Sequence, residues 1–281
     1  MTGGKSWGRT SKPGRVGRAG GYNPPVVVIH VLVTVFAMLV TIVDTIVLGS
    51  YGALVGRIPP KGDWTRKGAR LWARIICWAA FVRIRVEHAD RVPLPGPVVF
   101  MSNHESWIDI PVLLVAIPGQ VRFLAKKALF SMPFLGWAMR AMGFIPVDRE
   151  NRRTAIKSFE DAAARIRAGR SVLVFPEETR TPDGNLLPFQ RGGFLIALKA
   201  GLPIVPVGLD GARRCMPKHN YLVRPGRVTV RFGEPIPTEG RGVTAKAELM
   251  EQVRVQMEAL RGNPAGAVRV VGGGDEAAAG E

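Results

Sequence analysis

Residues 97–110 read "PVVFMSNHESWIDI", a short apolar run followed by three titratable side chains. The run at 97–103 is rich in Val and Phe, which is typical of a buried strand. His104 follows it directly, and Asp109 stands five positions later. In α/β proteins, residues that come just after a parallel strand line a crevice at the carboxyl edge of the sheet. The stretch therefore predicts a strand, a turn that carries chemistry, and a helix.

The rest of the chain repeats this alternation. Seven segments rich in Val, Ile or Phe are predicted strands, at residues 82–88, 97–103, 120–126, 143–148, 171–176, 202–209 and 227–233. Helices are predicted at residues 109–117, 127–141, 151–168, 191–200 and 243–261. Strands that alternate with helices predict an α/β fold with a mainly parallel central sheet flanked by helices.

Composition limits the class of protein. The chain has 281 residues, 47% of them hydrophobic, enough for one substantial core. Its 39 Lys and Arg against 22 Asp and Glu give a net charge of +17, which suits anionic lipid headgroups, phosphorylated small molecules, acidic carrier proteins or nucleic acid. The two cysteines, Cys77 and Cys215, are too few for a disulfide framework and show no metal-ligand spacing. We therefore expect a reducing compartment and no metal site.

The chain divides into four predicted parts. They are a flexible basic arm at 1–23, a membrane-associated helical segment at 24–80, the α/β domain at 81–261 and a disordered tail at 262–281. The segment from Pro24 to Ile58 has no Lys or Arg before Arg57, which is typical of a membrane helix. It is far longer than the apolar region of a signal peptide, so cleavage is not expected.

Basic residues flank this segment on both sides, which predicts that both of its ends lie on the cytoplasmic side. A straight helix of this length would reach roughly 45 Å, more than the ~30 Å hydrocarbon core requires. A re-entrant or interfacial helical hairpin, bent at Gly49, Gly52 and Gly56, satisfies both charge and length. The alternative is a single tilted spanning helix.

Residues 71–82 leave two interpretations open. They extend the membrane contact, with Arg70 and Arg74 reaching the headgroups, or they form a buried helix of the main domain.

The chemistry of the opening stretch depends on its local geometry. A carboxylate that fixes the tautomer of a histidine makes it a usable general base, able to activate a hydroxyl group. On one regular helix His104 and Asp109 would stand about 140° apart, so a bend near Glu105 and Ser106 is needed to bring them together. The alternative is a histidine in a surface loop, with Asp109 as a helix N-cap.

The stretch "SNHESWIDI" at 102–110 resembles the His-x4-Asp motif of the glycerolipid acyltransferases, and most closely the 1-acylglycerol-3-phosphate acyltransferases. Three further blocks resemble that family in order along the chain. They are "FLAKKALFSMPFLGWAMRAMGFIPVDR" at 123–149, "VFPEETRTPDG" at 174–184 and "GLPIVPVGLDG" at 201–211. Four ordered blocks are far more specific than any one of them.

The resemblance implies a role for each site residue. His104 would take the proton of a lysolipid hydroxyl while Asp109 orients the ring, and the hydroxyl oxygen would attack an acyl thioester directly. Blocks two and three imply that Arg149, Arg180 and Lys126 bind the glycerol phosphate of the acceptor, because guanidinium groups suit phosphate geometry.

The other two implied roles are less direct. Glu177 would position the acceptor or one of those arginines. Pro206 would shape the pocket of the acyl donor, although a proline at a strand edge is its ordinary interpretation.

The family pattern implies transfer to the sn-2 hydroxyl of 1-acylglycerol 3-phosphate (lysophosphatidic acid), giving phosphatidic acid in phospholipid biosynthesis. The donor would be acyl-CoA or acyl carrier protein, with no further cofactor. The other partners would be membrane lipids, with no nucleic acid. The catalytic domain would lie on the cytoplasmic side of a membrane, the cell membrane if the protein is bacterial.

Two departures from the family pattern bear on the acceptor. Glu178 stands where the family has glycine, and Pro146 where it has an aromatic residue. The Glu178 carboxylate would pair with a nearby arginine, Arg180 or Arg191, or would repel an anionic acceptor. The alternatives are therefore another acceptor, namely a lysophospholipid, a lyso-aminolipid, glycerol 3-phosphate or a glycolipid, or a noncatalytic basic protein that binds membranes or nucleic acid.

Overall fold

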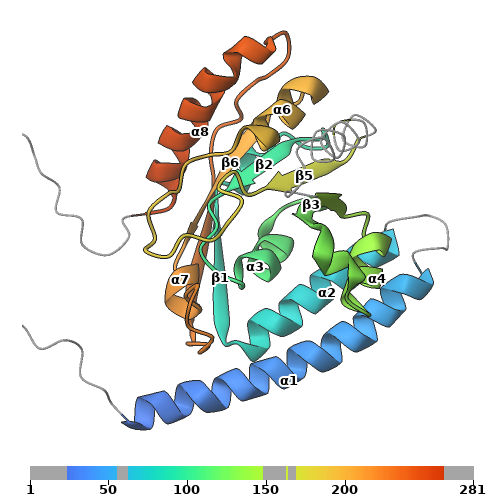
Figure 1. Ribbon diagram of the computed structural model, residues 1–281, viewed down its shortest axis with the longest axis vertical. Coiled ribbons are helices and arrows are strands. Elements are labelled where there is room, and N and C mark those ends of the chain that lie inside the picture. The colour runs from blue at the N-terminus through green and yellow to red at the C-terminus, as the bar shows by residue number, and fades with distance from the viewer. Residues whose placement is uncertain (1–23, 56–62, 148–162, 164–168, 263–281) are drawn as a thin grey trace, which may run out of the picture.

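The computed structural model describes residues 24–55, 63–147, 163 and 169–262, and shows one α/β domain with a helical pair along its flank (Figure 1). The strands are β1 Val82–Glu87, β2 Val99–Ser102, β3 Val121–Lys126, β4 Ile145–Val147, β5 Ser171–Val174, β6 Ile204–Asp210 and β7 Gly226–Phe232. They form a 7-stranded sheet in the order β1-β7-β6-β2-β5-β3-β4. Every pairing is parallel except that of β6 with β7. The predicted strands and fold class are confirmed.

Both faces of the sheet are covered. The helices are α1 Pro24–Val55, α2 Asp63–Ala79, α3 Asp109–Ala116, α4 Leu135–Ala141, α6 Arg191–Ala200, α7 Ala212–Cys215 and α8 Lys246–Leu260, with 3-10 turns η1 Ala89–Arg91, η2 Lys127–Ser131 and η3 Val243–Ala245. On β2, Phe100 packs with α2 and α3, while Val99 and Met101 belong to the core beneath α6 and α8. Successive side chains of a strand point to opposite faces, so burial on both faces explains why β2 is apolar throughout.

Two helix predictions differ from the structure. The single helix expected at 127–141 is broken into η2 and α4, with Met132 in an extended conformation (φ −69°, ψ 131°). Pro133 explains the break, because a proline disfavours the helical conformation of the residue before it. The helix expected at 151–168 lies outside the described residues, apart from Ala163, which is buried.

From Pro24 to Val55 the membrane segment is a continuous helix, so the predicted bend at Gly49 and Gly52 is wrong. The third predicted bending point, Gly56, lies outside the described residues. Gly49 and Gly52 serve close packing instead. A Cβ atom on Gly49 would lie 2.8 Å from the carbonyl oxygen of Phe134, the residue that precedes α4. Near the other end of α1, the Val223 N–H donates to Thr34 Oγ1 at 2.8 Å. The α/β domain therefore holds α1 at points 15 residues apart, roughly 22 Å along the helix.

Helix α2 has features of both interpretations of residues 71–82, because part of its surface is buried in the domain and part is exposed. It lies between α1 and α3, with Ala73 and Cys77 buried on its inner face and Trp78 exposed on its outer face. Arg70 does not reach for headgroups as predicted, because its Nη2 donates to the carbonyl oxygens of Ile117 (2.7 Å) and Gly119 (3.0 Å). The arginine ties α2 to the end of α3.

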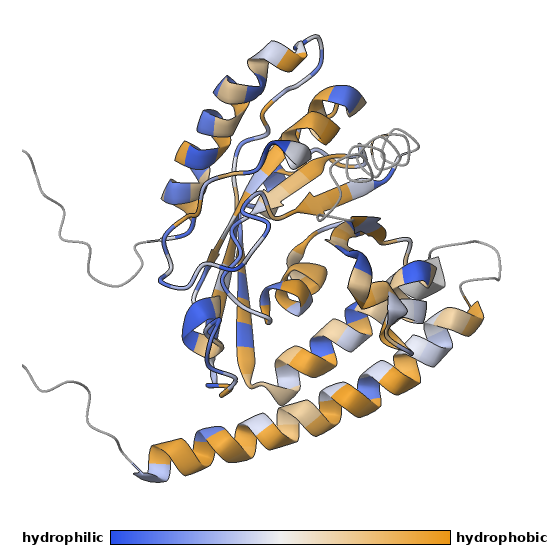
Figure 2. Ribbon diagram, viewed as in Figure 1, coloured by the Kyte–Doolittle hydropathy of each residue, from blue (hydrophilic) through white to orange (hydrophobic). Residues whose placement is uncertain are grey.

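The outward face of α1 is apolar and uncovered by protein. Leu32, Leu39, Val43 and Val47 are each more than half exposed, and Figure 2 shows the helix as an almost continuous apolar rod. Among the described helices, α1 is the one long and apolar enough to cross a membrane. Exposed apolar surface of this extent is typical of contact with lipid or with another protein, and α1 is the candidate membrane helix of the chain.

The contact between α1 and α4 predicts the effect of a substitution. Gly49→Leu should lower stability by about 1–3 kcal/mol, because the new side chain meets a main-chain carbonyl group that has no room to move. Thermal unfolding in detergent micelles measures the change. The matched control is Val47→Leu on the outward face, which should unfold like the wild type. Equal unfolding midpoints for both variants would contradict the close approach.

Candidate active site

The predicted turn lies between β2 and α3, and one carboxylate oxygen organises it. Asp109 is the first residue of α3, and its side chain is fully buried. Its Oδ2 lies 2.8 Å from Nδ1 of His104. The same oxygen accepts the backbone N–H groups of Glu105 (2.7 Å) and Ser106 (2.9 Å). The chain thus bends at the predicted place, and the interpretation of Asp109 as an N-cap is wrong.

These contacts determine the state of the imidazole. An ionised carboxylate is only an acceptor, so Nδ1 of His104 carries the proton that it shares with Asp109. The second ring nitrogen, Nε2, is then left to accept a proton. The ring also stacks on Phe175, with centroids 4.0 Å apart and planes 17° from parallel. His104 is 16% exposed, so it is not a histidine of a surface loop.

The loop that follows β5 holds the backbone of His104 from both sides. Glu177 Oε1 accepts the N–H of His104 at 2.9 Å, and the N–H of Thr181 donates to the carbonyl oxygen of His104 at 2.8 Å. The second oxygen of Glu177 accepts the N–H of Leu187 at 2.8 Å. Sequence reasoning assigned Glu177 to the acceptor or to an arginine, whereas the structure shows it joining two backbone segments.

Neighbouring strands and loops hold the rest of the turn. Asn103 Nδ2 donates to the carbonyl oxygen of Leu209 (3.0 Å), and its Oδ1 accepts the Leu209 N–H (2.7 Å), so the turn is bonded to the end of β6. Ser106 Oγ donates to the carbonyl oxygen of Met216 at 2.7 Å. These contacts make Ser106 a structural residue. Cys77 and Cys215 are also buried, which is consistent with a mechanism that uses no nucleophile of the protein.

Two further carboxyl groups lie buried beside the turn. Burial raises the pKa of Glu105 to about 7, with the nearby Asp109 carboxylate adding to the effect and the hydrogen bond from Asn103 opposing it. Burial also raises the pKa of Glu177, against the N–H groups of Leu187 and His104. At neutral pH Glu105 is therefore only partly ionised, and the carboxylate that contacts the imidazole directly is that of Asp109.

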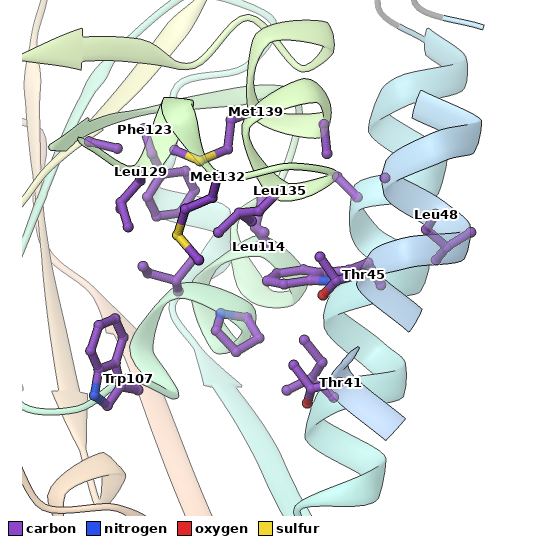
Figure 3. Close-up of a pocket in the computed structure, with 18 of the residues that line it drawn as sticks. Thr41, Thr45, Leu48, Trp107, Leu114, Phe123, Leu129, Met132, Leu135 and Met139 are labelled. Carbon is purple, nitrogen blue, oxygen red and sulfur yellow. The ribbon is translucent and has the colours of Figure 1, made fainter. Parts of the chain in front are cut away.

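A cavity of about 740 Å³ opens from His104 towards α1. In Figure 3, one side of the cavity carries Thr41, Thr45 and Leu48 of α1. The opposite side carries Leu129, Met132, Leu135 and Met139, and Trp107 lies at the end away from α1. The lining is mainly apolar, and its charged members among the described residues are Lys126 and Glu178. The cavity is thus mainly apolar, and His104, Lys126 and Glu178 are among the residues that line it.

The other predicted site residues are Lys126, Arg180, Arg149 and Pro206. Lys126 lines the cavity, and the Arg180 guanidinium lies 4.2 Å above the ring of Trp107, another lining residue. Arg149 lies outside the described residues. Pro206 is not among the described residues that line the cavity, and it lies in the central strand β6 rather than at a sheet edge. The prediction of Pro206 as a pocket wall is therefore not supported by this cavity.

Glu178 has an unusual backbone conformation. Its φ is 57°, in the left-handed region that favours glycine, and the residue lines the cavity with His104 and Lys126. Non-glycine residues in this region are uncommon and occur preferentially at functional sites.

Sequence reasoning missed Phe175 and Asn103 as members of the site. Their contacts join residues far apart in the chain, such as Asn103 and Leu209, and no local pattern encodes them. The only available signal was that both residues adjoin predicted strand ends.

With this geometry described, comparison with known proteins defines the class. Residues 83–210 match the Acyltransferase family model, and this range contains the His104–Asp109 turn and the Glu177 loop. In the fold, the chain resembles the crystal structure of the 1-acyl-sn-glycerophosphate (LPA) acyltransferase PlsC from Thermotoga maritima. The TM-score is 0.73, at 24% identity, over 83% of this chain and 94% of that one.

Curated relatives identify the family within this class. A 1-acyl-sn-glycerol-3-phosphate acyltransferase of Pseudomonas aeruginosa is 30% identical over 78% of this chain and 86% of its own length. The chain therefore belongs to the 1-acyl-sn-glycerol-3-phosphate acyltransferase family. The chloroplastic enzyme BAT2 of Brassica napus is 36% identical over 60% of this chain, but the match spans only 49% of that longer protein. The human alpha enzyme is 33% identical over 63% of this chain and 62% of its own length.

The buried Glu105 carboxyl predicts a dependence of stability on pH. Its pKa is raised from 4.5 to about 7 by folding, so its favourable contribution is complete below pH 4.5 and is lost as the pH rises through 7. Glu105→Gln keeps an acceptor for Asn103 but cannot ionise. The variant should therefore gain on the order of 2–3 kcal/mol over the wild type at pH 8, and the gain should vanish near pH 4.5.

Denaturant unfolding in detergent at the two pH values measures this gain, with the exposed Glu239→Gln as the control. A gain of the same size at both pH values would show that ionisation of Glu105 is not its cause.

Proposed function

We propose that the protein is an O-acyltransferase that moves a fatty acyl group from a thioester to the sn-2 hydroxyl of 1-acylglycerol 3-phosphate, giving phosphatidic acid. The observation that carries the proposal is the position of the His104–Asp109 pair at the polar end of an apolar cavity that α1 borders. This cavity suits an acyl chain, and the pair suits activation of a hydroxyl group beside it.

In the proposed mechanism, Nε2 of His104 removes the proton of the acceptor hydroxyl as its oxygen attacks the thioester carbonyl carbon. The carbon–sulfur bond then breaks, and the proton carried by His104 passes to the leaving thiolate. Asp109 holds the ring in the required tautomer and stabilises the imidazolium. Since the hydroxyl attacks directly, no acyl-enzyme intermediate forms.

Two cationic side chains are suited to the phosphate of the acceptor. Lys126 lines the cavity, and Arg180 is held over Trp107 with its Nη1 buried and without a hydrogen-bond partner among the described residues. A buried donor without a partner is rare, and a phosphate oxygen would supply one. These contacts support the acceptor-binding roles of Lys126 and Arg180.

The donor is proposed to be acyl-CoA or acyl carrier protein, with no further cofactor. Both donors are acidic, and the net charge of +17 suits either of them. The alcohol and the thioester supply all the atoms of the reaction.

The packing of α1 supports a position in one face of the membrane rather than a full crossing. The domain holds α1 at Thr34 and Gly49, along about 22 Å of the helix, so a helix perpendicular to the bilayer would draw the charged domain into the hydrocarbon region. Basic residues on both sides of the segment favour the cytoplasmic face. Lysolipid would then enter the cavity from the bilayer beside α1.

One observation favours a second candidate acceptor. The Glu178 carboxyl group lines the cavity in a strained backbone conformation, and a negative charge there disfavours a doubly charged phosphate. A lysophospholipid or a lyso-aminolipid would avoid this repulsion. A panel of lyso-acceptors assayed with the wild type and Glu178→Gly distinguishes the two candidates.

The catalytic pair gives the first functional prediction. His104→Ala should lower the rate of phosphatidic acid formation by at least ~10²-fold, since removal of a general base costs ~10²–10⁴-fold. Asp109→Asn should also lower it strongly, because an amide cannot accept three N–H groups at one oxygen and remain a charge partner.

The measurement is acyl transfer to lysophosphatidic acid by membranes with matched protein levels, with the product identified by mass. His88→Asn, at an exposed histidine in a left-handed conformation that asparagine tolerates, is the control and should act as the wild type. If His104→Ala retained full activity, the mechanism would be wrong.

The phosphate assignment gives another prediction. Arg180→Gln should raise KM for lysophosphatidic acid about tenfold or more, because it removes a charged donor from the phosphate. The change should be much smaller with a lyso-acceptor that lacks a phosphate monoester. Arg83→Gln, on the exposed edge of β1, makes the same change in net charge and should leave KM unaltered. An equal loss with both kinds of acceptor would remove Arg180 from the phosphate site.

A further inference from the structure

Thr34 is a polar residue of the apolar helix α1, and its side chain faces the α/β domain. It is 8% exposed, although Leu32 and Val35 beside it are more than half exposed. Its hydroxyl group donates to the carbonyl oxygen of His30 at 2.6 Å, which is an ordinary contact for a threonine within a helix. The same oxygen accepts the N–H of Val223 at 2.8 Å. This second contact joins α1 to a part of the domain 189 residues away, so the folding of α1 alone does not account for it.

The contact reaches one end of segment 216–223, which lies between α7 and β7. The segment is closed at its base, because the N–H of Arg224 donates to the carbonyl oxygen of Cys215 at 2.8 Å. This bond joins the peptide group before Met216 to the peptide group after Val223, so the first and last residues of the segment lie side by side. A displacement of Val223 therefore reaches Met216 directly across the base of the segment.

The other end of the segment holds the catalytic turn. The carbonyl oxygen of Met216 accepts the hydroxyl group of Ser106 at 2.7 Å, and this hydroxyl oxygen accepts the N–H of Ile108 at 3.1 Å. The N–H of Ser106 donates to Oδ2 of Asp109 at 2.9 Å, the oxygen that lies 2.8 Å from Nδ1 of His104. Ser106 is thus held between Met216 and the carboxylate oxygen that orients the imidazole ring.

We propose that Thr34 is a positioning residue for His104: by accepting the N–H of Val223, its hydroxyl group fixes the segment that holds Ser106. A buried N–H group that loses its acceptor is costly, so segment 216–223 should move when this hydroxyl is removed. A displacement of about 1 Å at a catalytic group costs up to ~10²-fold in rate. The inference rests on the proposed function only for its effect on rate, because the order of the turn can be measured without substrate.

Three variants separate this role from a general loss of stability. Thr34→Val has a similar shape without the hydroxyl group, and Thr34→Ala removes the same hydroxyl if Thr34→Val does not fold. Thr34→Ser keeps the hydroxyl.

The matched control is Thr238→Val, which also removes the hydroxyl group of a buried threonine. Thr238 is 1% exposed, and its hydroxyl bonds the carbonyl oxygens of Ala197 (3.2 Å) and Leu202 (2.8 Å). Leu202 precedes β6, whereas His104 follows the parallel strand β2, so this contact lies at the opposite edge of the sheet from the turn.

The first test is amide hydrogen exchange of the full chain in detergent micelles. In Thr34→Val the Ser106 amide should exchange at least about tenfold faster than in the wild type, because the turn opens locally. Thr34→Ser and Thr238→Val should leave this amide close to the wild type, and the amides of β2 report whether the sheet is intact. A Ser106 amide that stays as protected in Thr34→Val as in the wild type would show the proposal to be wrong.

Activity provides the second test. Thr34→Val should lower kcat for acyl transfer about tenfold, and Thr34→Ser should restore most of it. Thr238→Val should keep kcat although it unfolds at a lower temperature.

A double-mutant cycle with Ser106→Ala tests the path itself. Ser106→Ala breaks the path at its other end, so it should lower kcat, and adding Thr34→Val should cause no further loss. If Thr34→Val lowers kcat by the same factor in both backgrounds, Thr34 does not act through Ser106 and the proposal is wrong. If the wild type fails to acylate lysophosphatidic acid while the exchange results hold, the proposed function fails and the role of Thr34 in fixing the turn stands.

Discussion

The structure of the site depends on one fully buried carboxylate oxygen that accepts three N–H groups. Oδ2 of Asp109 bonds the ring of His104 and the backbone of the two residues that follow it. A desolvated charge is costly unless hydrogen-bond donors satisfy it. The same three contacts therefore fix both the bend of the turn and the orientation of the imidazole ring. This is why a spacing of five residues, wrong for one helical face, brings the two side chains together.

Further ionisable groups are buried around this oxygen. Glu105 and Glu177 are both buried near Asp109, and a site with three carboxyl groups would be unstable if all were ionised without compensation. Burial keeps Glu105 partly protonated near neutral pH, while each oxygen of Glu177 accepts a backbone N–H group. The negative charge next to the imidazole is therefore mainly that of Asp109, whose Oδ2 is satisfied by three N–H groups.

Much of this was predictable from local sequence. The strands followed from apolar runs buried on both faces, and the contact of His104 with Asp109 from a titratable turn directly after a strand. What failed or was missed depended on long-range contacts. Gly49 and Gly52 suggest a bend when only α1 is considered, but the approach of α4 explains them. The role of Glu177 was equally hidden, because its partner His104 lies 73 residues away and no local period encodes the contact.

The segment between α7 and β7 connects the membrane helix to the chemistry. At one end, the carbonyl oxygen of Met216 accepts the hydroxyl of Ser106 within the catalytic turn. At the other end, the N–H of Val223 donates to Thr34 of α1. Met216 and Val223 also line the cavity. Since this segment both lines the cavity and holds the turn, the placement of α1 on the domain and the geometry of His104 depend on the same contacts. Helix α1, although it lies on the outside of the domain, therefore contributes to the geometry of the site.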